Sequence, residues 1–227
     1  ESTAGPAPRK PFFTPGGILL GVVVIGLVVF LLLPFNRSGR EPARRNGCLN
    51  NTKQIMLAMH QYEIAHGSFP PAYTVDAEGN RLHSWRTLIL PYMEQQALYD
   101  KIDLTKPWDD PANAEPRDAV VQVYRCPSVS LEDKHFTTYL AIVDQDAMFP
   151  GSSSRTFAQL ADTANTICTI EVGAEQAVHW MSPYDIGIDE LLAAWKDMES
   201  PHQNVHIAGY ADGHAKSLNK DIDPEEL

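Results

Sequence analysis

Apolar residues are concentrated near the start of the chain. Residues 16–35 contain no charged side chain and consist mostly of Leu, Val and Ile. As an α-helix this segment would be about 30 Å long, which is the thickness of the hydrocarbon core of a bilayer. The alternative is a cleaved signal peptide, but its apolar core usually has about 7–15 residues and ends at small residues, whereas this segment ends in Pro34 and Phe35. The pattern predicts a transmembrane helix over 16–35.

Helical spacing of apolar residues returns after this segment. Residues such as Ile55 and Met59 recur every three or four positions, which predicts a helix over 36–66. Pro42 is expected to kink or interrupt the helix, because proline lacks the backbone N–H that an inner turn requires. Gly67 is expected to end it.

Two further helices are predicted. One begins at Ser84, which has the side chain of an N-cap, and continues to Leu98 with Pro91 as a defect inside it. The other is a short amphipathic helix over 188–198.

The second half of the chain has the composition of β-strands. Runs rich in Val, Ile, Thr and Tyr predict strands at Val120–Tyr124, Thr137–Val143 and Thr166–Val172. A hairpin is predicted from two alternating runs, His206–Tyr210 and His214–Leu218, because Asp212-Gly213 between them is a strong turn signal.

Helices that come early and antiparallel strands that come late indicate an α+β fold rather than alternating βαβ units. Residues 1–15 contain four prolines and are predicted to be a disordered lead-in. The predicted order is therefore this lead-in, the transmembrane helix at 16–35, a helix over 36–66 that continues into the folded domain, and an antiparallel sheet with attached helices over 67–227.

The charge is distributed unevenly. The net charge is −11, but residues 1–45 carry +4 and the remainder carries −15. An acidic domain repels phosphate backbones, which argues against a nucleic acid partner. Two basic residues precede the apolar segment and four follow it, so the positive-inside rule alone would place the C-terminal domain in the cytoplasm.

Four residues near the C-terminus are candidate metal ligands. His202, His206 and His214 lie close in sequence to Asp212, and the hairpin would place His206 and His214 at or near opposed positions. In the competing interpretation Asp212 only forms the turn, and His202 hydrogen-bonds to the backbone of the preceding loop. No cofactor is expected otherwise.

Calcium is a second possibility for a bound ion, since it prefers carboxylate oxygens. The acidic pairs lack the spacing of a calcium-binding loop, and solvated loop carboxylates are the simpler interpretation. These pairs are Asp109-Asp110, Asp144/Asp146 and Asp221/Asp223.

The sequence does not predict an enzyme. It contains no GxSxG, HExxH, P-loop or GxGxxG motif. The cysteines lack CxxC or Cys/His spacing, so structural zinc is not expected, although two cysteines can pair in an oxidising compartment. Aromatic residues could line a ligand cleft or form ordinary core: Trp85, Trp108, Trp180, Trp195 and Tyr184.

Ordered motifs along the chain resemble a known family. They are Arg40–Arg45 (REPARR), Cys48, Asn50–Ile55 (NNTKQI), Phe69–Tyr73 (FPPAY), Ser84–Arg86, Leu90–Tyr92, Glu94-Gln95, Leu98-Tyr99, Cys126–Ser128, Thr138-Tyr139 and Asn165–Ile167, with His202 and Asp212-Gly213 in an H-x9-DG arrangement. Together they resemble the DUF1559 family of planctomycete prepilin-like proteins.

This resemblance implies an N-terminal helix like that of type IV pilins and pseudopilins, with the C-terminal domain outside the cytoplasmic membrane. It therefore reverses the orientation that the charge count favours. It also implies a disulfide between Cys48 and Cys126, whereas Cys168, within an apolar run, is expected to be a buried free thiol.

The processing region departs from the prepilin pattern, in which cleavage follows a Gly and the fifth mature residue is Glu. Alignment on Phe13 puts Phe12 at the Gly position and Gly17 at the Glu position, so both determinants are missing. We therefore expect a permanently anchored pilin-like protein rather than a pilus subunit.

Two functions follow as hypotheses. The first is a single-pass protein of the bacterial inner membrane with a periplasmic domain, which acts as a non-catalytic structural or assembly component and contacts the bilayer and pilin-like subunits, including copies of itself. The second is a membrane-tethered extracytoplasmic module that binds a solute or a metal.

Overall fold

The computed structural model describes residues 15–32 and 40–223. The chain divides into a unit up to Arg40 and a compact unit from Glu41 onward. The first contains helix α1 (Pro15–Leu32), on which the described side chains of Leu, Val and Ile are all exposed. None of the described helices is both long and apolar enough to cross a membrane. The predicted span of 16–35 runs past Leu32 into residues that are not described, as does the lead-in at 1–14.

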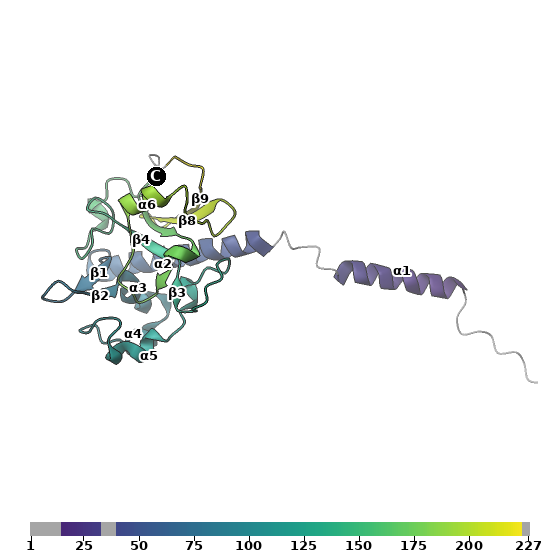
Figure 1. Ribbon diagram of the computed structural model, residues 1–227, viewed down its shortest axis with the longest axis horizontal. Coiled ribbons are helices and arrows are strands. Elements are labelled where there is room, and N and C mark those ends of the chain that lie inside the picture. The colour runs from purple at the N-terminus through teal and green to yellow at the C-terminus, as the bar shows by residue number, and fades with distance from the viewer. Residues whose placement is uncertain (1–14, 33–39, 224–227) are drawn as a thin grey trace, which may run out of the picture. The chain divides into compact units, whose positions relative to one another are not determined.

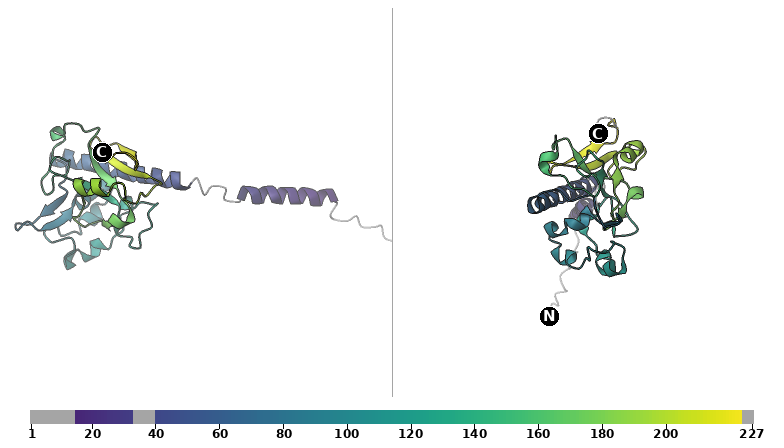
Figure 2. Two further views of the ribbon diagram at one scale, coloured as in Figure 1. Left: turned by 45° about the horizontal axis from the view of Figure 1, so that its top comes forward. Right: turned by 90° about the vertical axis from the view of Figure 1, so that its left-hand side faces the viewer.

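The compact unit is built from one long helix, several short helices and three sheets (Figures 1 and 2). The helices are α2 (Arg40–His66), α3 (Trp85–Leu88), α4 (Gln96–Tyr99), α5 (Ala114–Arg117) and α6 (Ile188–Ala194), with 3-10 turns η1 (Leu90–Met93), η2 (Pro111–Asn113), η3 (Gln122–Tyr124), η4 (Phe157–Gln159) and η5 (Ala174–Gln176). The strands are β1 (Tyr73–Val75), β2 (Arg81–Ser84), β3 (Phe136–Thr137), β4 (Tyr139–Val143), β5 (Ile167–Glu171), β6 (Val178–His179), β7 (Ile186–Gly187), β8 (Val205–Tyr210) and β9 (Ala215–Asn219).

The main sheet has five strands in the order β7-β4-β5-β8-β9. The pairs β4-β5, β5-β8 and β8-β9 are antiparallel, and the short β7 pairs with β4 in parallel. The antiparallel pairs β1-β2 and β3-β6 form two small sheets. The α+β fold class with a largely antiparallel sheet is therefore confirmed.

The main sheet is covered on both faces, because successive side chains of a strand point to opposite sides. On β4, Tyr139 and Ala141 join the core that contains the buried residues of α2, whereas Leu140 and Ile142 join a second core with Leu191 of α6. We call these sides the α2 face and the α6 face.

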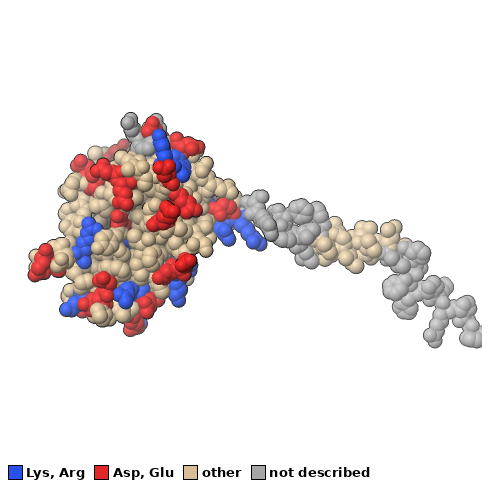
Figure 3. All heavy atoms as spheres, in the orientation of Figure 1, with Lys and Arg blue, Asp and Glu red and all other residues tan. Residues whose placement is uncertain are grey.

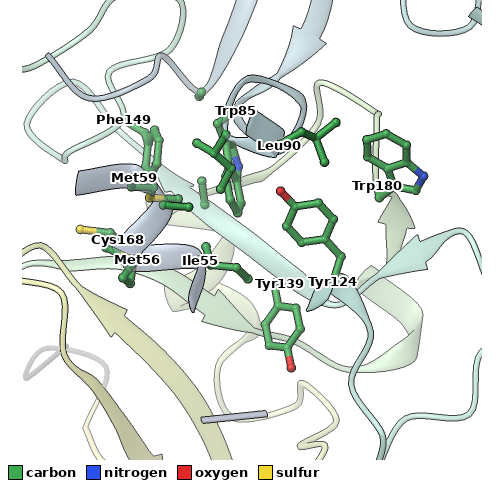
Figure 4. Packing of buried hydrophobic residues seen from close by; sticks show 14 of the residues in the cluster. Ile55, Met56, Met59, Trp85, Leu90, Tyr124, Tyr139, Phe149, Cys168 and Trp180 are labelled. Carbon is green, nitrogen blue, oxygen red and sulfur yellow. The ribbon is translucent and has the colours of Figure 1, made fainter. Parts of the chain in front are cut away.

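The core on the α2 face is rich in aromatic residues (Figure 4). Trp85 packs against Tyr124 and Phe149, with ring centroids 6.3 and 6.0 Å apart. Met56 and Met59 of α2 lie beside them and are fully buried. Large side chains from distant segments thus hold α2 against the sheet.

Prolines act differently from the sequence prediction. Helix α2 runs through Pro42 without interruption, because Pro42 lies in the first described turn, where its missing N–H has no partner to lose. The prediction of one helix from Ser84 to Leu98 is wrong, because the structure divides this segment into α3, η1 and α4. Ser84 does cap α3 by accepting a hydrogen bond from the Arg86 backbone, but the chain then passes through η1, which contains Pro91, and turns at Glu94 with a φ of 59°.

The strand predictions were confirmed in part. β4, β5, β8 and β9 occupy the predicted segments, and Gly67 ends α2 with a φ of +78°. The predicted strand Val120–Tyr124 is wrong, since it contains the 3-10 turn η3. The short hairpin β1-β2 was not predicted from the sequence.

A histidine on β6 should make stability depend on pH. Burial lowers the pKa of His179 to about 4, with additional repulsion from His135 and Arg117 that the charge of Asp133 partly offsets. An unfolded histidine titrates near pH 6.5. The unfolded state therefore binds the proton preferentially between about pH 6.5 and 4, and stability is lost as the pH falls through that window.

Because His179 is partly solvent-exposed, we expect the loss to be about 1 kcal/mol. Urea unfolding of the wild type and of His179→Gln at pH 7 and pH 4.5 measures it. The variant should lose less stability than the wild type on acidification, and equal losses would contradict the prediction.

Candidate functional site

Four polar side chains meet in the interior on the α2 face. Cys48 lies on α2, Cys126 follows η3, Glu171 is the last residue of β5, and His202 precedes β8. All four are buried, and one ligand atom from each lies within 4.8 Å of the others. We call this group the Cys-Glu-His cluster.

Local structure explains why Cys48 and Glu171 point inward. Cys48 begins the buried stripe of α2 that continues with Thr52, Ile55 and Met56. Glu171 pairs in register with Tyr139, whose side chain is also on the α2 face. The two cysteines, 78 residues apart, are thus brought together by packing of α2 against the loop after η3.

The thiols are close neighbours. The sulfurs of Cys48 and Cys126 lie 2.8 Å apart, and both cysteines are free in this structure. Cys126 also accepts a hydrogen bond from the backbone N–H of Ser128 at 3.3 Å. The hydrogen bond with Cys48 and burial raise the pKa of the Cys126 thiol. The disulfide that the resemblance implies stays a prediction, although the structure brings the two partners together.

His202 bridges two carboxylates. Its Nδ1 lies 2.7 Å from Oε1 of Glu41, and its Nε2 lies 3.2 Å from Oε2 of Glu171. Burial opposes the charged imidazole, but contacts with Cys126, Glu171 and Glu41 outweigh it and raise the pKa of His202 to about 10. Ser128 donates a hydrogen bond to Glu41 and so helps to fix this outer carboxylate.

The other predicted metal ligands lie elsewhere. His206 pairs with Leu218 and not with His214, and its Nδ1 contacts the backbone oxygen of Glu171. The expected opposition of His206 and His214 is wrong, because β8 and β9 pair from Val205 to Gly209 and leave His214 in the turn. There His214 Nδ1 lies 2.6 Å from Asp212 Oδ1. Of the four predicted ligands, the structure places only His202 in the cluster.

The remaining predicted sites are the processing region and the acidic pairs. Phe12 and Phe13 lie outside the described residues, and Gly17 lies within α1. Among the acidic pairs, Asp110 and Asp144 each accept a backbone N–H two residues ahead, which is the role of a turn or cap residue. Across the described ranges, the Cys-Glu-His cluster is the single group of three or more metal-capable side chains.

Sequence reasoning missed Glu171 and Glu41. Glu171 is the only charged residue in the predicted strand Thr166–Val172. Because a buried charge requires a partner, that isolated carboxylate was a usable signal. No local sequence pattern indicated Glu41, because its contact partner His202 is 161 positions away in the sequence.

The α6 face carries an apolar groove of about 420 Å³. The lining residues include Ile142 and Ile170 of the sheet, Leu191 of α6, Trp195 and Asp144. The tryptophans do not gather in one cleft, however. Trp85 and Trp180 are buried in the core on the α2 face, while Trp195 belongs to the core on the α6 face.

Most of the chain matches one protein family. Residues 37–185 match the model of a family described as a protein of unknown function, DUF1559 (SBP_bac_10). The chain belongs to the DUF1559 family. The matched part of this DUF1559 protein includes Cys48, Cys126 and Glu171 but ends before His202 and the H-x9-DG segment. No curated protein and no solved structure matches the chain.

Proposed function

We propose that this DUF1559 protein is a membrane-anchored, pilin-like structural or assembly component of the bacterial cell envelope, and that it is not an enzyme. The observation that carries the proposal is the packing of a long helix, α2, against a largely antiparallel sheet, directly after an apolar helix in the sequence. A pilin-like protein combines these elements in this order.

Helix α1 supports the anchor. Its described large side chains are apolar and exposed around the helix, for example Leu19, Val23 and Ile25. A helix without a polar face requires apolar surroundings on all sides. The proposed anchor is the whole uncharged segment 16–35, which extends beyond the described residues, and its orientation follows from the family resemblance: N-terminus inside, C-terminal domain in the periplasm.

Helix α2 supports a role in assembly. One stripe of the helix is buried against the sheet, while Leu57 and Ile64 on another side are 58% and 80% exposed. Two large apolar residues seven positions apart occupy the same side of a helix. They offer a contact for a second copy or another pilin-like subunit.

The charge on the surface of the compact unit argues against a nucleic acid as its partner. Acidic side chains are spread over the face shown in Figure 3, with fewer basic ones between them. The net charge of −15 beyond residue 45 disfavours binding to phosphate backbones.

The test is to fractionate cells that produce the full chain and to image the protein purified in detergent by electron microscopy. We expect the full chain in the membrane fraction and filaments or rings in the images. Val24→Arg should lower the share of the chain in the membrane fraction, because a charge at the centre of a span costs about 2.5–3.5 kcal/mol, and Val24→Leu is the matched control. A full chain that fractionates as soluble would refute the anchor, and isolated particles alone would refute assembly.

A second function, a tethered solute-binding module, is favoured by the groove on the α6 face. Its volume of about 420 Å³ lies within the usual range for small-molecule sites. Isolated particles, together with a thermal shift on adding an apolar solute, would support this function instead.

A further inference from the structure

The Cys-Glu-His cluster has the donor set of a transition-metal site. It offers two sulfurs, one imidazole nitrogen and one carboxylate oxygen, and each comes from a buried side chain. Thiolate sulfur selects Zn²⁺ and similar soft metals over Ca²⁺ and Mg²⁺, which prefer oxygen. Cys, His and Glu side chains are all zinc ligands, and four protein donors are the number that a closed, tetrahedral zinc site uses.

The distances from His202 to two of the other donors suit one ion. With zinc–sulfur bonds of about 2.3 Å and zinc–nitrogen or zinc–oxygen bonds of about 2.0–2.2 Å, the donor atoms of a tetrahedron lie roughly 3.3–3.8 Å apart. Nε2 of His202 lies 3.2 Å from Oε2 of Glu171 and 3.8 Å from Sγ of Cys126. The two sulfurs, 2.8 Å apart, need to separate by about 1 Å to complete the tetrahedron.

Surrounding contacts also point to a ligand. Within the described residues, Oε2 of Glu171 contacts only Nε2 of His202, and Oε1 of the same carboxylate is buried without a hydrogen-bond partner. A buried carboxylate with so few partners is costly, and a metal ion bound through either oxygen would neutralise its charge. Nδ1 of His202 faces Glu41 at 2.7 Å, while Nε2 faces the cluster. Histidine ligands of metals commonly donate their other ring N–H to a carboxylate in this way.

We propose that Cys48, Cys126, Glu171 and His202 bind one Zn²⁺ ion, with Glu41 as the positioning residue for His202. On binding, both thiols and Nε2 of His202 release their protons to solvent, because the ligands are thiolates and a neutral imidazole. No position is left for water or substrate, so the ion cross-links α2, the loop after η3, the end of β5 and the segment before β8.

Local spacing of cysteines and histidines did not indicate this site, because each ligand comes from a separate part of the chain. The site excludes the Cys48–Cys126 disulfide, since the same two sulfurs cannot be oxidised to a disulfide and bind zinc as thiolates. The zinc-bound state therefore contains one zinc ion and no Cys48–Cys126 disulfide, whereas the oxidised state contains the disulfide and no zinc.

The experiment uses the full chain in detergent, reduced and freed of metal with a chelator. It is then equilibrated with Zn²⁺ alone and, separately, with Co²⁺ as a spectroscopic probe. We expect one Zn²⁺ per chain by elemental analysis, and for Co²⁺ the strong visible absorption of a tetrahedral ion together with a thiolate charge-transfer band.

Substitutions test which side chains bind the zinc ion. Cys126→Ser and Glu171→Gln should each weaken zinc binding at least 100-fold, and Glu41→Gln should weaken it about 10–100-fold, as loss of a carboxylate behind a histidine ligand does. Cys168→Ser is the matched control, because it removes a third buried thiol outside the cluster and should leave affinity unchanged.

The Co²⁺ spectrum of the wild type tests the site even if a variant fails to fold. The proposal is overturned if the reduced, folded chain takes up no zinc, or if its Co²⁺ spectrum lacks the thiolate band. A protein isolated from cells with an intact Cys48–Cys126 disulfide and no zinc would also overturn it.

Discussion

Arg86→Met is expected to lower the free energy of unfolding by about 3–5 kcal/mol, because it leaves a buried carboxylate without its counter-ion. Arg86 and Asp185 form an ion pair with 2.6 Å between Nη1 and Oδ1, and both side chains are fully buried. Burial raises the pKa of Asp185, and the charge of Arg86 counteracts this shift. Without the guanidinium, Asp185 must either remain charged in the interior or take up a proton.

The guanidinium also joins separate segments. Its nitrogens donate to backbone oxygens of Tyr139 on β4 and of Trp180, Ser182 and Tyr184 in the loop before β7. Methionine satisfies none of these four acceptors, and each buried acceptor left unpaired adds to the loss.

Urea unfolding followed by tryptophan fluorescence measures the change. Arg81→Met is the matched control: Arg81 donates one 3.3 Å hydrogen bond to Pro183 and stacks over Tyr73, so its loss should stay near 1 kcal/mol. The double variant Arg86→Met/Asp185→Asn should be less destabilised than the sum of the single variants, because the two side chains are coupled. A loss below 1 kcal/mol for Arg86→Met would show that the buried pair does not stabilise the fold.

Gly209→Ala should lower the free energy of unfolding by about 1–3 kcal/mol through overpacking. Gly209 lies on β8 where α2 crosses the sheet. A Cβ at this position would lie 2.5 Å from Oγ1 of Thr169, and 2.9 Å from Cγ of Met56 and Cγ2 of Thr52. The added methyl group therefore pushes α2 away from the sheet.

Gly47→Ala provides the control on α2 itself. The new Cβ would lie 3.5 Å from Pro127, an ordinary contact, and alanine favours a helix over glycine by about 1 kcal/mol. This variant should be as stable as the wild type or more so. If the two glycine variants behave alike in urea unfolding, close approach of α2 at Gly209 does not limit the packing.

Much of the fold was predictable because the relevant signals are local. The spacing of Ile55 and Met59 predicts α2, and the alternation on both sides of Asp212-Gly213 predicts the β8-β9 hairpin. The helix predicted from Ser84 to Leu98 failed because η1 ends in a left-handed turn at Glu94, whose backbone N–H bonds to Leu90, and the spacing of apolar residues does not record such a turn.

The candidate site was predictable only in part. The pairing of Cys48 with Cys126 came from family resemblance, and His202 came from its position before Asp212-Gly213. Periodicity could not reveal which face of the sheet each histidine occupies. His206 belongs to β8 and lies near Trp195 on the α6 face, with ring centroids 4.8 Å apart, whereas His202, just before the strand, reaches the α2 face.

The order of strands has a consequence for how the chain matures during synthesis. Strand β5 lies between β4 and β8, so one of its edges stays open until residues 205–210 have left the ribosome. A nascent chain that ends before His202 already contains both Cys48 and Cys126, yet it lacks the imidazole that later lies beside them. Before the C-terminal segment is in place, an oxidant would therefore meet the same two cysteines without His202 beside Cys126, whereas in the complete fold the imidazole lies 3.8 Å from that sulfur.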